Sequence, residues 1–145
     1  AVAVCGFASR RLAYIGWVAT SYDAKMSFDP LPYHVDFDRG EAATGGAWTV
    51  PAYRGRGLYR YMFGRELDYL RRTGRTVCCN AIATNNDASH RGQAVYGAVT
   101  YARARFVRVL AFRRWTERLV VDPGTESFPG SPQTRGAEAA SVRGR

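Results

Sequence analysis

The chain has 145 residues, 46% hydrophobic and 13% aromatic, which is enough for one domain with an apolar core. No apolar run approaches the roughly 20 residues of a membrane helix, and the first residues do not resemble a signal peptide, so we expect a cytoplasmic protein with no membrane partner. The three cysteines do not form a spaced disulfide framework, which favours a reducing compartment.

The net charge of +9 comes from 21 basic and 12 acidic residues, and its position in the chain matters. From residue 119 onward three arginines balance three acidic residues: Arg135, Arg143, Arg145, Asp122, Glu126 and Glu138. The excess therefore lies in residues 1–118, which suits an anionic ligand such as nucleic acid or a small phosphorylated cofactor. We expect one domain over 1–118 and a disordered tail over 119–145, which is rich in Gly, Pro, Ser and Arg.

The first half of the chain predicts strands. Two apolar runs, 1–7 and 12–20, flank a polar turn and predict a hairpin. Residues 21–46 are interrupted by prolines and glycines, so we expect a long excursion with a short strand near 33–37. A strand over 47–50 should stop at Pro51, which has no N–H to donate to a sheet.

The second half alternates helix and strand. Residues 58–73 predict a helix that ends at Gly74, with one apolar stripe of Tyr59, Phe63, Leu67 and Leu70. Residues 75–84 predict a strand buried on both faces, and a turn at 85–89 can cap a helix over about 88–99. Residues 103–115 predict one or two closing antiparallel strands, so the fold class is α/β with a mixed sheet.

The segment Arg54-Gly55-Arg56-Gly57 joins a strand to a helix and carries the strongest chemical signal. Its glycines let backbone N–H groups converge, and the helix start adds partial positive charge, so the segment favours a phosphate. A Gly-rich turn with two solvated arginines is the alternative. A P-loop is excluded because Leu58 follows Gly57, and a dinucleotide fingerprint is excluded because Arg60 replaces its third glycine.

The run Val50-Pro51-x-Tyr53-Arg54-Gly55-x-Gly57-Leu58 resembles the acetyl-CoA signature of the GNAT superfamily of acyl-CoA N-acyltransferases. Asn86-x-x-Ser89 followed by Gly97 resembles a second family segment, and the resemblance covers 1–118. Thr49 and Tyr59 look closest to a subgroup associated with polysaccharide biosynthesis. The chain begins at the family's second strand, so we expect a GNAT-like fold lacking the first strand and first two helices, either as a fragment or as a shortened fold.

The resemblance implies a cofactor site for acetyl-CoA or another acyl-CoA. Trp48, Thr49 and Val50 would accept the pantetheine arm. The pyrophosphate would be held by Arg54, Gly55, Arg56, Gly57, Leu58 and Tyr59. Asn86 and Ser89 would contact the far part of the cofactor or organise the turn.

Three residues depart from the family pattern: Tyr59 replaces Gly or Ala, Ala98 replaces Phe, and Gln93 replaces a tyrosine that protonates the leaving thiolate. Tyr96 is the nearest replacement for that acid and is otherwise a core residue.

The implied reaction is direct transfer of the acyl group to an amine in a ternary complex. Glu41 is our first candidate for the general base, with His34, Asp36 and Asp38 as alternatives. For each of them the pattern favours a solvated loop residue. The expected partner is a small-molecule amine, an amino sugar among the candidates, and a homodimer is a further alternative. A CoA-binding module without catalysis remains a second hypothesis.

Two other groups of residues give weaker indications of a ligand site. Cys78 and Cys79 point to opposite faces of a strand and the histidines lack ligand spacing, so no metal site is expected. Aromatic and basic residues interleave near the end of the domain, at Tyr101, Arg103, Arg105, Phe106 and Arg108. This pattern can suit single-stranded nucleic acid, but it favours a half-exposed strand.

Overall fold

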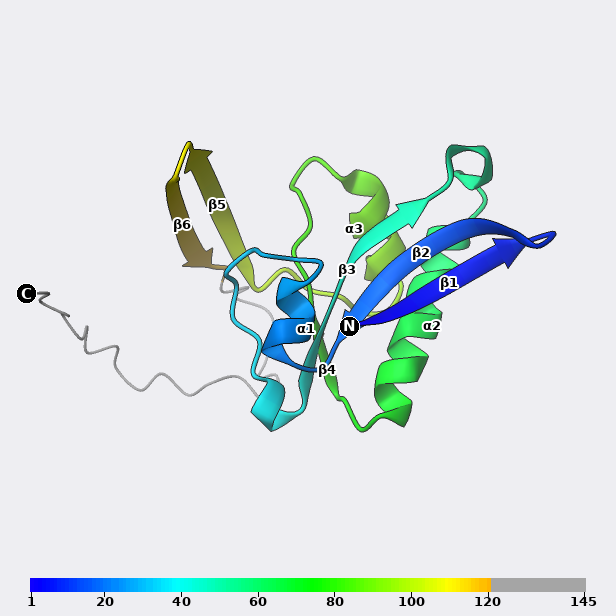
Figure 1. Ribbon diagram of the computed structural model, residues 1–145, viewed down its shortest axis with the longest axis horizontal. Helices are drawn as coiled ribbons and strands as arrows, with labels where there is room; N and C mark the ends of the chain where they lie inside the picture. Colours follow the sequence, from blue (N-terminus) through cyan, green and yellow to red (C-terminus); the bar gives the residue numbers. More distant parts are fainter. Residues whose placement is uncertain (121–145) are drawn as a thin grey trace, which may run out of the picture.

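The computed structural model describes residues 1–120 (Figure 1). Apart from residues 119 and 120, the predicted tail lies outside the described residues. In the part described, no helix is both long enough and apolar enough to cross a membrane. The main sheet has four strands in the order β1-β2-β3-β4.

The predicted N-terminal hairpin is confirmed. β1 (Val2–Ala8) pairs antiparallel with β2 (Arg11–Ala19), with Val2 opposite Val18. The turn residues Ser9 and Arg10 both have positive φ, which matches the right-handed twist of the flanking strands. β2 then pairs antiparallel with β3 (Glu41–Thr49), which begins six residues before the predicted strand.

The excursion between these strands contains α1 (Tyr22–Met26) and the short 3-10 helix η1 (Phe37–Arg39). The strand predicted near 33–37 is wrong. Tyr33 and Val35 are buried with alternate spacing, but they pack on one face of the sheet instead of pairing with a strand. The alternation of apolar residues therefore reflects side chains that pack on the sheet, not a strand that is hydrogen-bonded to it.

The predicted long helix is confirmed as α2 (Leu58–Arg72), which follows the short 3-10 helix η2 (Pro51–Tyr53). Its buried face is rotated from the predicted stripe and consists of Met62, Phe63, Glu66 and Leu70. Glu66 lies in place of Leu67 because its carboxylate accepts a 2.8 Å hydrogen bond from the buried Tyr14 hydroxyl. A specific polar partner thus overrides the apolar pattern.

Two apolar clusters lie on opposite faces of the sheet. One joins Val18 and Ala42 to Leu70 of α2. The other joins Ala19 and Ala43 to side chains of the 21–40 excursion. Successive residues of β3 thus serve opposite faces, and α2 covers one face while α1 and its loop cover the other (Figure 1).

The last elements differ most from expectation. β4 (Val77–Cys79) has three residues, parallel to β3, and its first residue is exposed, so the predicted long, doubly buried strand is wrong. α3 (Asp87–Ala94) starts as predicted but ends earlier, because a turn follows through Gly97. β5 (Ala102–Val109) and β6 (Phe112–Leu119) confirm the antiparallel pair, but they form a separate two-stranded sheet and do not close the main one (Figure 1).

Candidate active site

The site begins where β3 and β4 part. The two strands pair only from Glu41 to Ala43, because β4 ends at Cys79. From Thr44 to Thr49 the edge of β3 that would face β4 has no strand partner within residues 1–120. Its backbone donors and acceptors are therefore open to a ligand that lies alongside as an extended chain.

This open half of β3 carries a bulge. Ile15 pairs with Trp48 and Trp17 pairs with Gly45, so two β3 residues, Gly46 and Ala47, lie opposite the single Gly16 of β2. Gly46 has φ +58, and a Cβ there would lie 2.9 Å from the Trp17 ring. A glycine is therefore needed at this bulge, which redirects the backbone at the open edge.

Beyond β3, the chain turns through η2 into the Arg54–Gly57 loop. Gly55 and Gly57 have φ +72 and +75, and a Cβ on either would meet nothing within 4 Å, so space lies above both. Gly57 is the N-cap of α2 and no side chain caps the first turn. The loop thus presents glycine backbone and an uncapped helix start to open space, which is favourable for an anion.

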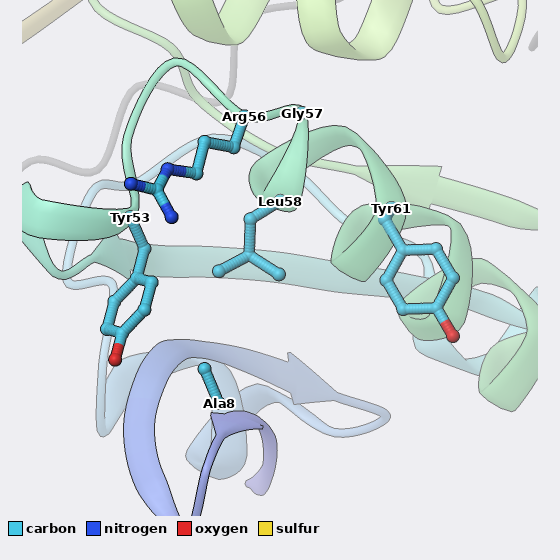
Figure 2. A pocket seen from close by; sticks show the side chains of 6 residues that line it. All are labelled: Ala8, Tyr53, Arg56, Gly57, Leu58 and Tyr61. Atoms are coloured by element: carbon cyan, nitrogen blue, oxygen red, sulfur yellow. The ribbon is translucent and has the colours of Figure 1, made fainter.

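Two arginines add positive charge to the loop. Arg54 Nε donates to the Thr49 carbonyl at 2.9 Å, which ties the loop to the end of β3. The ion pairs recorded for residues 1–120 involve Asp36 and Asp68, so neither loop arginine is neutralised by a carboxylate there. Figure 2 shows Arg56 reaching back across the loop toward Tyr53, above a shallow hollow of about 290 Å³ that Leu58 also lines.

A row of side-chain hydrogen bonds crosses the gap between β3 and the helices. Asn80, just after β4, donates from Nδ2 to Thr44 Oγ1 at 3.3 Å and to Gln93 Oε1 at 3.1 Å. Gln93 of α3 donates from Nε2 to the Tyr59 hydroxyl of α2 at 2.9 Å. Three elements, β3, α2 and α3, and the residue that follows β4 are therefore joined by one row of polar side chains: Thr44, Asn80, Gln93 and Tyr59.

Titratable groups beside this row keep their protons at neutral pH. Burial raises the pKa of Tyr59, although hydrogen bonds from Gln93 and Ser89 oppose the shift. Burial also raises the pKa of Cys78, whose thiol lies 3.4 Å from Thr44 Oγ1, to about 11. Because the thiolate is the nucleophilic form of cysteine, Cys78 is not poised for attack.

The structure separates the two predicted catalytic residues from this row. Glu41 lies in the paired half of β3, where its carboxylate accepts from the Asp36 N–H and the Cys79 thiol. Five residues of strand separate Glu41 from Gly46, about 16 Å. The Tyr96 hydroxyl donates to the Arg60 carbonyl at 2.9 Å and its ring packs on Phe63, so this side chain is part of the α2 contact.

The other predicted cofactor residues lie in two places, along the second half of β3 and at the start of α3. Trp48 is 47% exposed on the open half of β3, and Val50 donates to the Ala13 carbonyl at 2.9 Å. Asn86 is the N-cap of α3 and accepts from the Ser89 N–H at 3.1 Å. Among the alternatives for the base, His34 is exposed and Asp36 caps η1.

Sequence reasoning missed a cluster of side chains beside the β3 bulge, on the face of the sheet that the excursion covers. The rings of Trp17 and Phe28 stack with centroids 6.5 Å apart, and Phe28 lies over Gly45. Asp29 is adjacent, and its carboxylate accepts from the Tyr33 hydroxyl at 2.8 Å. No spacing rule joins residue 17 to 28–33, because the contact depends on how the excursion folds back over the sheet.

Two other arrangements bear on metal and nucleic-acid binding. No group of three His, Cys, Asp or Glu side chains in the described part of the chain is placed to hold a metal ion. The basic and aromatic residues near residue 106 lie on the separate hairpin, where the Phe106 and Trp115 rings are 6.4 Å apart. Nearly all residues of that hairpin are exposed, so the half-exposed strand that the pattern favoured is wrong: β5 and β6 form a separate two-stranded sheet with no buried face.

Neither a protein-family model nor a curated protein sequence matches this chain. Two solved structures resemble it. One is YncA, a proposed acetyltransferase from Salmonella typhimurium solved with its cofactor acetyl-CoA: 18% identity, 79% of this chain, 62% of that chain and a TM-score of 0.52. The other is the aminoglycoside 6′-N-acetyltransferase AAC(6′)-IG from Acinetobacter haemolyticus, without ligand: 14% identity, 74% and 66% covered, and a TM-score of 0.43.

The chain spans about three fifths of YncA, and identity at this level is evidence of fold only. The chain therefore has a mixed α/β fold of the GNAT acetyltransferase type.

Proposed function

We propose that the protein transfers an acyl group from acetyl-CoA, or another acyl-CoA, directly to an amine. The observation that carries the proposal is the continuity of the open edge of β3 with the Arg54–Gly57 loop. An acyl-CoA is itself an extended amide chain that ends in a pyrophosphate. The strand edge suits the chain and the loop suits the pyrophosphate.

In this arrangement the pyrophosphate lies on Gly55 and Gly57, between the charges of Arg54 and Arg56. The pantetheine arm runs along β3 from Thr49 toward Thr44 and brings the thioester beside the bulge. Backbone N–H groups redirected by the bulge then stabilise the oxyanion as the amine attacks. Asn86, which caps α3, and Ser89 organise the turn beside the arm.

The amine approaches from the Trp17–Phe28 face. Asp29 lies near Gly45 on that face, so its carboxylate can hold an ammonium or accept a proton when the amine attacks. This placement makes Asp29 a better candidate than Glu41 for the base. Direct transfer is favoured over an acyl-cysteine route because the thiol beside the gap, Cys78, stays protonated.

Calorimetry and thiol release test the proposal together. We expect acetyl-CoA to bind with micromolar affinity, and CoA thiol to appear when an amine panel is added. The panel should contain glucosamine, spermidine and a dipeptide with a free N-terminus, because the polysaccharide-subgroup resemblance motivates amino sugars first. Absence of binding at millimolar acetyl-CoA would refute the proposal. Binding without turnover on any amine would favour a non-catalytic CoA-binding module.

A further inference from the structure

The hairpin of β5 and β6 stands apart from the main sheet, and its two faces carry different side chains (Figure 1). Residues directly opposite each other share a face, and so do residues two apart along a strand. Phe106 is opposite Trp115, so these two rings lie on one face. Trp115 packs against the cluster that contains Tyr33 and Val35, so this face is turned toward the rest of the domain.

The opposite face of the hairpin gathers four arginines, two from each strand. The pairing register places there Arg103, Arg105, Arg114 and Arg118. Arg103 lies directly opposite Arg118, and all four residues are exposed. The basic and aromatic residues that interleave in the sequence are thus largely sorted onto different faces. We call the surface of these four residues the arginine face.

No carboxylate neutralises the arginine face within residues 1–120. The ion pairs recorded there involve Asp36 and Asp68, which belong to other elements. The acidic residue of the hairpin, Glu117, is opposite Ala104 on the other face and accepts from Trp115 Nε1 at 3.0 Å. The arginine face is therefore a local excess of positive charge, which attracts a polyanion.

The same charges destabilise the hairpin on its own. Arg103 and Arg118 are like charges directly opposite each other, and Arg108 and Arg113 repeat this pairing on the other face near the tip. Like charges so placed weaken a sheet, and an isolated two-stranded hairpin is only marginally stable in water. A phosphate that lies between two guanidinium groups removes the repulsion, so the hairpin gains stability from a phosphate-bearing partner.

Among such partners, duplex DNA fits better than a single strand. Proteins that bind single strands stack the bases on aromatic rings beside basic residues. Here Phe106 and Trp115 lie on the face away from the arginines, and the arginine face has one ring, Phe112, next to the tip. A two-stranded ribbon can enter the major groove of B-form DNA, which is about 12 Å wide. Guanidinium groups pair bidentately with phosphate and with guanine.

An anionic membrane fits less well. The tip of the hairpin is apolar and Leu110 is 92% exposed, so the tip suits a lipid surface. Arg103 is seven residues from Leu110, about 23 Å of strand, which is well beyond a Debye length of about 8 Å. A lipid surface that the tip reaches would therefore leave Arg103 and Arg118 without a partner.

We propose that the arginine face binds double-stranded DNA, with the β5–β6 ribbon in the major groove and its arginines on the phosphate backbone. The inference goes beyond the proposed function and does not depend on it, because the hairpin is separate from the main sheet that contains β3. Four arginine–phosphate contacts predict a slope of about −3.6 for the logarithm of affinity against the logarithm of salt concentration. Affinity should therefore fall about 150-fold between 50 and 200 mM salt.

The test is the fluorescence anisotropy of a labelled DNA duplex of mixed sequence, titrated with the full chain at several salt concentrations. Arg103→Gln combined with Arg118→Gln removes two contacts and a like-charge pair, so the hairpin should stay folded. The slope should become about −1.8, a fall in affinity of about 12-fold over the same salt range. The control, Arg72→Gln combined with Arg91→Gln, removes equal charge from exposed positions of α2 and α3 and should keep the wild-type slope.

Three results would overturn the inference. An unchanged slope in the hairpin variant, or an equal change in the control, would assign binding to the overall charge of +9. Tighter binding to one strand of the same sequence, or displacement of the duplex by phosphatidylserine vesicles at a lower phosphate concentration than by unlabelled duplex, would identify another partner. Failure to bind the duplex at 50 mM salt would refute any DNA site. The proposed function is tested separately, because acetyl-CoA affinity should be the same in the hairpin variant and wild type.

Discussion

The two halves of β3 differ in what holds them. From Glu41 to Ala43 the strand is paired with β4, Ala43 is paired with β2 as well, and Ala42 and Ala43 are fully buried. From Thr44 onward only the β2 edge is paired, and residues 46–48 are exposed. One strand therefore contains a half that is paired with β4 and a half whose edge is open, and the two are separated by the end of β4 at Cys79.

This difference separates the half of β3 that belongs to the core from the half that we propose binds the cofactor. The paired half is covered by Leu70 on one face and by Tyr33 and Val35 on the other, so it is part of the core. The open half has a bulge and unpaired backbone groups, which weaken a sheet unless a ligand uses them. Substitutions in the first half should affect folding, and substitutions in the second half should affect binding.

The largest expected difference between the two halves of β3 is seen when the same carboxylate is introduced into each of them. Ala42→Asp buries an unpaired charge and should lower the free energy of unfolding by more than about 3 kcal/mol. Ala47→Asp, at an exposed position, should change it by less than about 0.5 kcal/mol while weakening acetyl-CoA binding. Urea unfolding and calorimetry measure the two effects. Equal destabilisation by both substitutions would contradict the division of β3.

A second prediction concerns the buried carboxyl behind the bulge. Glu66 lies against Gly16, which faces the bulge of β3, and burial raises its pKa to about 7. The folded state therefore binds the proton more tightly than the unfolded state, so stability should fall as pH rises from about 4.5 to about 7. The change is at most about 3 kcal/mol. Glu66→Gln keeps an acceptor for Tyr14 and should remove this decline, as followed by thermal unfolding across that range. A decline that persisted in the variant would assign it to another group.

A third prediction concerns the two arginines of the Arg54–Gly57 loop and their contribution to acetyl-CoA affinity. Arg56→Ala removes a charge beside the proposed pyrophosphate and should weaken acetyl-CoA binding about tenfold, or about 1.4 kcal/mol. The loss should shrink at high salt. Arg105→Ala on the exposed β5 is the matched control for net charge. Similar losses in both variants would indicate a diffuse effect of the +9 charge instead of a site.

The smallest expected effect concerns Tyr96. Tyr96→Phe removes its hydrogen bond to the Arg60 carbonyl and should cost about 1 kcal/mol of stability, measured by urea unfolding. A fall in kcat at unchanged stability would return Tyr96 to the acid role that its sequence position first indicated.

Local signals predicted the local parts of this molecule. The hairpin followed from two apolar runs around a polar turn, and α2 followed from a periodic stripe that ends at Gly74. The glycine loop between a strand and α2 was likewise readable, because its chemistry depends on adjacent residues.

Contacts between distant segments could not be predicted in this way. The partner of Glu66 is 52 residues earlier, at Tyr14, so its burial has no local signal. The row from Thr44 to Asn80 joins residues 36 apart, and its outcome depends on where β4 stops. Asp29 acquired its place near Gly45 only through the folding of the excursion. The side chains around the open edge of β3 are brought together by tertiary packing, so a short motif can indicate the proposed cofactor loop but not the proposed base.

Hydrogen exchange with and without acetyl-CoA tests the central claim most directly. The account predicts that amides of residues 44–49 and 55–60 become protected on addition of the ligand. Those of 41–43 lie in the half that is paired with β4 and should not change. Protection that appeared elsewhere, or none along the open half of β3 at saturating acetyl-CoA, would contradict the account.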